Sequence, residues 1–140
     1  MGISAKLSIS IEIRRDVEID AIIRLYEEAG WWRDAYDRKF ISGILTGSFC
    51  FAAAYAGDEL IGMGRALSDG ASDAYIQDVT VLKALRGRGV GRRIILAIIN
   101  HLKAHGVDWI ALVGEPGTRG FYEKLGFREM HAYIPMKLSD

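Results

Sequence analysis

The feature that most constrains the fold is a run of three glycines and four arginines, RGRGVGRR, which lies between two apolar segments. The segment before it, AYIQDVTVL, is rich in β-branched and aromatic residues, which favours a strand. The segment after it carries apolar residues at helical spacing, namely Val90, Ile94, Ile95, Ile98, Ile99 and Leu102. Gly106 then ends the helix and VDWIALV follows as a short strand. The unit from Tyr75 to Val113 therefore predicts two parallel strands joined by a helix.

The glycine turn lies where this helix begins, which makes it a candidate anion site. The first turn of a helix has free N–H groups and the positive end of the helix dipole. Glycines let an anion approach the backbone, and guanidinium groups suit phosphate oxygens. We therefore expect a phosphate site over Arg86–Arg92. On these residues alone, a tight turn with solvated arginines remains the alternative.

Spacing excludes the two best-known phosphate loops. A P-loop requires GxxxxGK followed by Ser or Thr, and no glycine here precedes such a pair. A dinucleotide fingerprint requires GxGxxG, but counting from Gly87 places Arg92 at the sixth position. An RG-rich segment that binds nucleic acid is polar and disordered, whereas this one continues directly into an apolar helix.

Charge and composition argue against several kinds of partner. The 18 Lys and Arg balance 18 Asp and Glu, so a general nucleic-acid binder is not expected. Cys50 is the single cysteine, which excludes an internal disulfide, and His101 and His105 have no evident acidic or cysteine partner, so no metal site is expected. No run approaches the roughly 20 apolar residues of a membrane span, and we expect a cytoplasmic protein without a membrane partner.

The remaining elements complete an α/β (α+β) fold. Leu7, Ile9, Ile11 and Ile13 alternate as in a strand, and Gly57-Asp58 predicts a hairpin turn. No repeat or linker divides the chain, so a single domain over 1–140 is expected. The predicted order is β-α-α-β-β-β-α-β-α-β, a mixed central sheet flanked by helices, with two helices between residues 16 and 47, a short helix in TRGFYEKLGF and a final strand in HAYIPMKL.

Two motifs together carry a family resemblance. RGRGVG fits the [Q/R]-x-x-G-x-[G/A] motif of the GNAT superfamily of acetyl-coenzyme A-dependent N-acetyltransferases. Tyr122, 31 residues after Gly91, lies in FYEKLGF, which is similar to the F/L-Y-x-K-x-G-F segment that ends the core of these enzymes. The stretch GRALSDGASDAYIQDVTVL also resembles serotonin-type and other small-amine acetyltransferases, in which a G-x-x-R-x-x-S-D loop precedes a strand containing D-V-x-V.

The resemblance implies a binding site for acetyl-CoA as co-substrate. In the family, amides of the glycine turn hold the coenzyme pyrophosphate, and the backbone of the preceding strand pairs with the pantetheine arm. The residues implied here are Val79, Thr80, Val81, Arg86, Gly87, Arg88, Gly89, Val90, Gly91, Arg92 and Tyr122.

Two catalytic residues are implied by the same motifs. Tyr122 matches the family's tyrosine that protonates the departing thiolate, a role that suits a phenol with a pKa near 10. Asp78 matches the aspartate of the serotonin-like strand and is the candidate base, directly or through water. A packing role for Tyr122 and a salt-bridged or solvated Asp78 are the structural alternatives. Glu115 departs from the asparagine that the family usually has seven residues before the tyrosine.

The acceptor site is expected between the first two helices and around the third and fourth strands. Its candidate residues are Trp31, Trp32, Tyr36, Arg65 and Asp69, with the tryptophans suited to an amine through cation–π contact. The function implied is acetylation of the primary amine of a small molecule, by direct attack in a ternary complex. A protein α-amine or lysine as acceptor and a non-catalytic coenzyme A-binding sensor are the alternatives, and a homodimer is left open.

Overall fold

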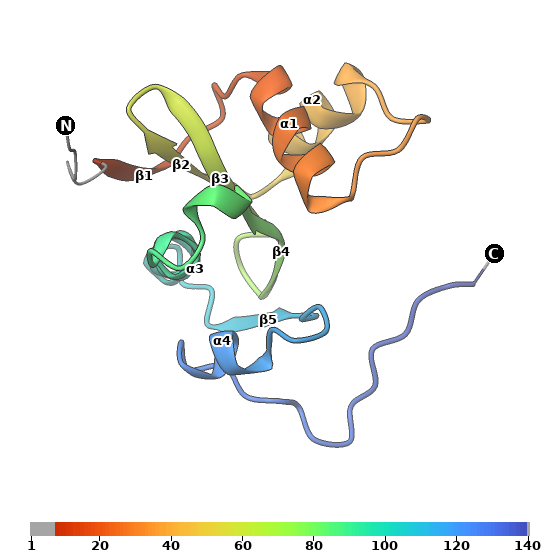
Figure 1. The fold of residues 1–140 in the computed structure, drawn as a ribbon. Helices are drawn as coiled ribbons and strands as arrows, with labels where there is room; N and C mark the ends of the chain where they lie inside the picture. Colours follow the sequence, from red (N-terminus) through yellow and green to blue (C-terminus); the bar gives the residue numbers. More distant parts are fainter. Residues whose placement is uncertain (1–7, 140) are drawn as a thin grey trace.

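The computed structural model describes residues 8–139 and has an α/β fold built on one mixed sheet (Figure 1). Leu7 of the predicted first strand lies outside the described residues. A 3₁₀ turn at Lys83–Leu85 follows the fourth strand. The elements are β1 (Ile9–Ile13), α1 (Ile19–Ala29), α2 (Arg38–Gly47), β2 (Cys50–Ala56), β3 (Glu59–Ser68), β4 (Asp73–Val81), α3 (Val90–Ala104), β5 (Trp109–Leu112) and α4 (Arg119–Glu123).

The strands lie in the order β1-β2-β3-β4-β5. The pairs from β1 to β4 are antiparallel, and β2 turns into β3 at Gly57, whose φ of +61° suits a glycine in a two-residue hairpin turn. The pair of β4 and β5 is parallel, with α3 as the connection between them. The predicted fold class and the predicted strand–helix–strand unit are therefore confirmed.

The helix ends agree with their local sequence. The side chain of Asp37 accepts a hydrogen bond of 3.0 Å from the N–H of Phe40 and so caps the start of α2. Gly30 follows α1 in the left-handed conformation, with a φ of +80°, and the N–H of Trp31 closes this end on the carbonyl of Tyr26. This closure places Trp31 beside the carboxyl end of α1.

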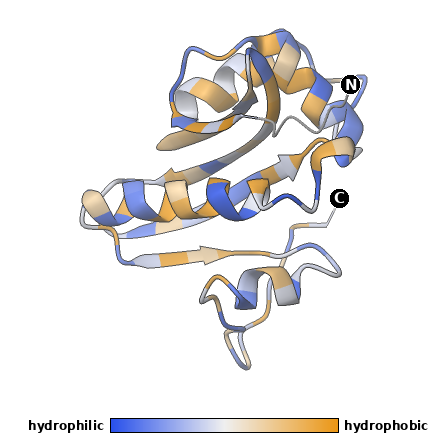
Figure 2. Ribbon diagram, turned by 60° about the vertical axis from the view of Figure 1, so that its left-hand side comes forward, coloured by the Kyte–Doolittle hydropathy of each residue, from blue (hydrophilic) through white to orange (hydrophobic). Residues whose placement is uncertain are grey.

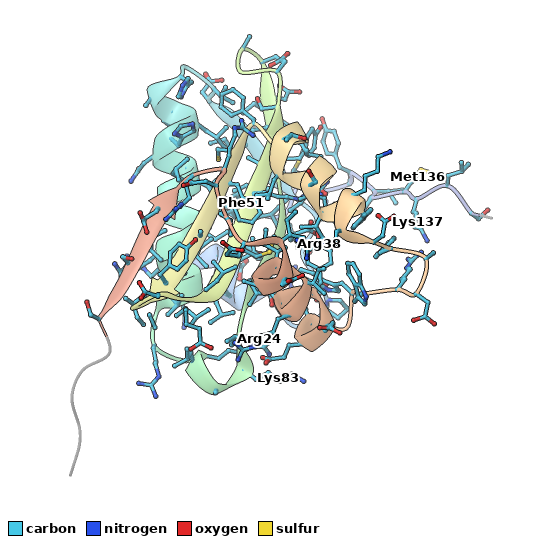
Figure 3. All side chains as sticks on the ribbon, turned by 90° about the horizontal axis from the view of Figure 1, so that it is seen from above. Arg24, Arg38, Phe51, Lys83, Met136 and Lys137 are labelled. Atoms are coloured by element: carbon cyan, nitrogen blue, oxygen red, sulfur yellow. The ribbon has the colours of Figure 1, made fainter. Side chains whose placement is uncertain are left out.

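The helices cover both faces of the sheet, with α1 and α2 on one side and α3 on the other (Figure 1). Hydrophilic and hydrophobic residues alternate along α3 with helical period, so that one stripe faces the sheet (Figure 2). Phe51 of β2 lies fully buried near the middle of the molecule (Figure 3).

Two glycines of β3 let α3 rest on the strand backbone. A Cβ atom at Gly64 would lie 2.8 Å from Cγ2 of Ile94 and 3.1 Å from Cδ1 of Ile98. A Cβ atom at Gly62, two residues earlier on the same face, would lie 3.1 Å from Cδ1 of Ile94. The close approach of α3 to the sheet thus depends on the absence of side chains at these two positions.

The strand predicted over residues 131–138 is wrong. A turn that the N–H of Tyr133 closes on the carbonyl of Met130, with Ala132 at a φ of +69°, leads into a segment that runs away from the sheet (Figure 1). Alternation of apolar residues predicts the period of a strand but not a neighbouring strand to pair with.

Within residues 8–139, no helix is long and apolar enough to cross a membrane.

Gly64→Ala should lower the free energy of unfolding by about 1–3 kcal/mol, because the added methyl group overpacks the contact with α3. Urea denaturation of the purified protein measures this. Gly43→Ala is the matched control: a Cβ there meets nothing within 4 Å, and it should leave stability unchanged or raise it by about 0.5–1 kcal/mol. Equal stability of the Gly64 variant and the wild type would contradict the close contact.

Candidate active site

Two cavities meet along β4 and α4. The loop cavity, of about 840 Å³, lies between β4, the glycine turn and α4. The bulge cavity, of about 410 Å³, lies between the strands β4 and β5. Five residues line both cavities: Trp31, Val79, Glu115, Thr118 and Tyr122.

A β-bulge in β4 opens the sheet at this place. Met63 of β3 faces Thr80, but Arg65 faces Gln77, so Asp78 and Val79 together oppose Gly64. Asp78 has a φ of +54°, in the left-handed region that side-chain-bearing residues rarely occupy, at a cost of about 1–3 kcal/mol. Such strain persists where surrounding contacts hold it, and it concentrates at functional sites.

Beyond the bulge, the edge of β4 is free of its parallel neighbour. β5 pairs with β4 only from Asp73 to Ile76, whereas β4 continues to Val81. Residues 77–81 therefore present backbone groups toward the cavities without a β5 partner. An extended ligand arm in this space could add to β4 as a further strand would.

The Asp78 side chain is held by two other elements. Its Oδ2 accepts a hydrogen bond of 2.7 Å from Nε of Arg65 and one of 2.5 Å from the hydroxyl of Tyr26. Arg65 also contacts the hydroxyl of Ser48 at 3.3 Å and the amide oxygen of Gln77 at 3.4 Å. The network joins α1, β3 and β4 at the bulge. Burial, followed by the Asp78 carboxylate, raises the pKa of the Tyr26 phenol.

The glycine turn has the geometry of an anion cradle. Gly87 and Gly89 have φ values of +77° and +78°, and α3 begins at the next residue, Val90. In the described part of the chain, the N–H groups of residues 87–92 donate no backbone hydrogen bond, and the first such donor is Arg93, to Gly89. A row of free amides at the positive end of a 15-residue helix fits a pyrophosphate.

The arginines of the turn differ in their roles. Nε of Arg86 donates a hydrogen bond of 2.9 Å to the carbonyl of Val81, so this arginine ties the turn to the end of β4 as well as lining the loop cavity. Arg92 lines the loop cavity, and Arg88 lies outside it. The other residues expected to bind the coenzyme all line the loop cavity.

Tyr122 lies on α4 at the junction of the cavities, half-buried between Phe121 and Phe127. Burial, followed by the negative charge of Glu115, raises the pKa of its phenol. The phenol therefore keeps its proton at neutral pH and can donate it to a group that becomes negative during a reaction.

Glu115 is a site residue that the sequence did not identify. It lines both cavities, and within residues 8–139 no hydrogen bond or ion pair uses its carboxylate. Its position seven residues before Tyr122, where the family usually has asparagine, was the signal available. Three further residues of the site were identified only from the structure. Tyr75 and Gln77 line the bulge cavity, and the hydroxyl of Tyr26 donates a hydrogen bond to Asp78.

The predicted acceptor residues separate into two groups. Trp31 lines both cavities, whereas Arg65 lines neither and forms an ion pair with Asp78, which lines the bulge cavity. Trp32 and Tyr36 lie outside both cavities and pack edge to face against each other, with ring centroids 5.7 Å apart.

Asp69 also lies outside both cavities and organises its own loop. Its Oδ1 accepts hydrogen bonds of 2.8 Å from the N–H groups of Ala71 and Ser72. These bonds, with one from the Ser72 hydroxyl, lower the pKa of the Asp69 carboxyl to about 2. Among residues 8–139, no group of three or more His, Cys, Asp or Glu is placed to hold a metal ion.

The model of the acetyltransferase (GNAT) family matches residues 16–127, which is most of the chain. The chain belongs to this family. It is similar to serotonin N-acetyltransferase 2 of Oryza sativa subsp. japonica, with 39% identity over 48% of this chain and 34% of that protein. It is also similar to a histone acetyltransferase of Glycine max, with 31% identity over 80% of this chain and 52% of that protein. The present chain thus spans about a third to a half of the length of these two relatives.

Solved structures share the fold. A GNAT family acetyltransferase from Streptococcus pneumoniae superposes with a TM-score of 0.83, at 23% identity over 95% of this chain and 98% of that chain. An aminoglycoside N-acetyltransferase in complex with CoA superposes with a TM-score of 0.75, at 16% identity over 97% and 98%. The predicted membership of the GNAT superfamily is confirmed.

Tyr26→Phe should lower the free energy of unfolding by about 1–2 kcal/mol, since it removes a part-buried hydrogen bond to a carboxylate. Tyr36→Phe is the matched control: within residues 8–139 its hydroxyl makes no hydrogen bond, and the change should stay within about 0.5 kcal/mol. Urea denaturation compares the two variants, and equal effects would remove the network's role in stability.

The same Tyr26 variant should change the alkaline limb of stability. The pKa of Tyr26 lies above its ordinary value of 10.0 in the folded protein, so its contribution is complete below about pH 10 and is lost as pH rises further. The free energy of unfolding should therefore fall more steeply above about pH 10 in the wild type than in Tyr26→Phe. Parallel slopes in a pH series of urea denaturation would contradict this.

Proposed function

We propose that this GNAT protein transfers an acetyl group from acetyl-CoA to the primary amine of a small molecule, by direct attack in a ternary complex. The observation that carries the proposal is the meeting of the two cavities at Val79 and Tyr122. A donor in one cavity and an acceptor in the other would bring their reacting atoms together at this junction.

The loop cavity suits the donor. The free amides of residues 87–92 would hold its pyrophosphate, and the open edge of β4 beyond Gln77 would pair with its pantetheine arm. Acetyl-CoA supplies the thioester carbonyl carbon that the amine attacks, so that a C–N bond forms as the C–S bond breaks. Arg92 adds positive charge beside the phosphates.

The bulge cavity suits a cationic acceptor. Trp31 and Tyr75 supply aromatic walls, and Asp78 and Glu115 supply two carboxylates. An ammonium group gains from both, by cation–π contact and by charge attraction. A volume of about 410 Å³ lies in the range of small-molecule sites.

The proton transfers follow from the same residues. Oδ2 of Asp78 is used by Arg65 and Tyr26, which leaves Oδ1 to take a proton from the ammonium group, directly or through water. The hydroxyl of Tyr122 gives its proton to the departing sulfur. The nitrogen releases its second proton to water, which reprotonates Tyr122. Asp78 then releases the first proton to solvent, so both residues return to their starting protonation states.

An amine panel with detection of released thiol tests the proposal. It contains tryptamines, polyamines, aminoglycosides and histone-tail peptides, the last because the similar soybean protein is named a histone acetyltransferase. We expect turnover of a small amine with the highest kcat/KM. Preference for a peptide would move the assignment to protein acetylation. Binding of acetyl-CoA, seen as a raised melting temperature, without turnover of any amine would point to a sensor.

Tyr122→Phe should lower kcat by about 100-fold or more, because the thiolate loses its proton donor, while the affinity for coenzyme A stays within about threefold. Steady-state kinetics and titration calorimetry measure the two quantities. Tyr133→Phe, at an exposed tyrosine outside both cavities, is the matched control and should behave as the wild type. An undiminished kcat would exclude the acid role.

Glu115→Gln should raise KM for a cationic amine by about three- to tenfold, through loss of one charge attraction in a partly solvated site. The alkaline limit of the pH–rate profile should also move to lower pH, because the Glu115 charge no longer raises the pKa of Tyr122. Glu123→Gln, on α4 but outside both cavities, is the control. Identical kinetics of the two variants would exclude Glu115 from the acceptor site.

A further inference from the structure

Two histidines at the end of α3 lie outside the proposed active site and form a pair. His101 and His105 are four residues apart, which places them on the same side of the helix. Their ring centroids are 4.5 Å apart, and the ring planes are inclined by 42°. Neither residue lines the loop cavity or the bulge cavity. The acetyl transfer proposed above therefore gives these two imidazoles no role.

A hydrogen bond orients the ring of His105. Its Nδ1 lies 2.8 Å from the carbonyl oxygen of His101. Because a carbonyl only accepts, Nδ1 carries the proton, and the lone pair of the neutral ring lies on Nε2. The carbonyl is available because the backbone N–H of His105 donates to Leu102 instead. Histidines that bind metals are commonly held in this way, with one ring N–H on a carbonyl and the other nitrogen on the ion.

His101 is in the form that binds metals at neutral pH. Burial, followed by the charges of His105 and Arg15, lowers the pKa of its imidazole. The ring is therefore neutral at pH 7, as coordination requires. Within residues 8–139, the ring nitrogens of His101 make no hydrogen bond. The charge of Arg15 opposes a bound cation, but its guanidinium is engaged by the carbonyls of Leu45 and Phe49.

Phe49 limits the movement of both imidazole rings. It packs edge to face against His101 and His105, with ring centroids 5.9 Å and 5.3 Å away. Gly70, in the loop between β3 and β4, lies close to the same phenyl ring, since a Cβ atom there would be 2.7 Å from Cε1 of Phe49. The two imidazoles therefore lose less conformational entropy on binding a ligand than two unrestrained surface side chains would.

The spacing of the rings fits one coordination geometry. A metal–nitrogen bond of about 2.1 Å places the centre of an imidazole ring about 3.2 Å from the ion. Two rings at a right angle around the ion then have centres about 4.5 Å apart, whereas the tetrahedral angle gives about 5.2 Å. The observed 4.5 Å agrees with the right angle, which occurs in square-planar and tetragonal sites of Cu²⁺ and Ni²⁺.

We propose that His101 and His105 together bind one divalent transition-metal ion, through one ring nitrogen each. Within residues 8–139, no group of three or more His, Cys, Asp or Glu surrounds such an ion, so water completes its coordination. The negative end of the helix dipole at the last turn of α3 also favours a cation. The two ends of this 15-residue helix are about 20 Å apart, so the site is separate from the glycine turn.

Titration calorimetry of the purified chain without an affinity tag, with NiCl₂ at pH 7.5, tests the proposal. We expect one Ni²⁺ per chain, with a dissociation constant on the order of 10 μM, and tighter binding of Cu²⁺. His101→Asn and His105→Asn each leave a single imidazole and should raise the dissociation constant at least about tenfold. His131→Asn, at an exposed histidine outside the pair, is the matched control and should bind as the wild type. No binding by the wild type, or equal binding by all variants, would overturn the proposal.

Thermal unfolding provides a second measurement that shows whether each variant folds. An excess of Ni²⁺ should raise the melting temperature of the wild type and of His131→Asn by several degrees, because the ion binds the native state. The same excess should change it by less than about 1 °C in His101→Asn and His105→Asn. Mg²⁺, which prefers oxygen ligands, should stabilise none of the four proteins. A rise that is equal in all four with Ni²⁺ would contradict a site at the histidine pair.

Discussion

The shared carboxylate oxygen of Asp78, held between Arg65 and Tyr26, is the contact on which the geometry of the site depends. It stabilises a left-handed residue in the middle of a strand, and that residue forms the bulge that shifts the register of β4 against β3. β4 parts from β5 at the same place, which opens both cavities. Because the three residues come from α1, β3 and β4, correct packing of the first helix is a condition for an open site.

A second constraint positions the glycine turn at the start of α3. α3 rests on the backbone of β3 at Gly62 and Gly64, and its first turn lies beside the end of β4, where Arg86 binds the carbonyl of Val81. β4 therefore has the bulge at its middle and the contact with the glycine turn at its end. The proposed donor and acceptor sites both lie along β4, and Tyr122 of α4 lies at the junction of the two cavities.

The sequence predicted those elements of the fold that depend on residues close together in the chain. Helical and strand periods, with the glycines between them, were enough to predict the parallel pair and the glycine turn at the start of α3, because both depend on neighbouring residues. The roles of Tyr26 and Glu115 were not visible, because each depends on residues that only the tertiary structure brings close. Trp32, Tyr36 and Asp69 are polar or aromatic loop residues, and no pattern separates packing and loop capping from substrate contact. The period of residues 131–138 was strand-like, but period alone contains no information about the partner strand.

The close packing of α3 on the glycines of β3 affects the distance between the glycine turn and Asp78. At Gly62 and Gly64, the side chains of Ile94 and Ile98 rest on strand backbone that carries no side chain, so no rotamer change on the β3 side can alter the contact. This contact helps to set how far the free amides of residues 87–92, at the start of α3, lie from Asp78 of β4. In the proposed reaction, an acyl donor whose phosphate lies on these amides therefore needs an arm long enough to bring its acyl carbon to the junction of the two cavities.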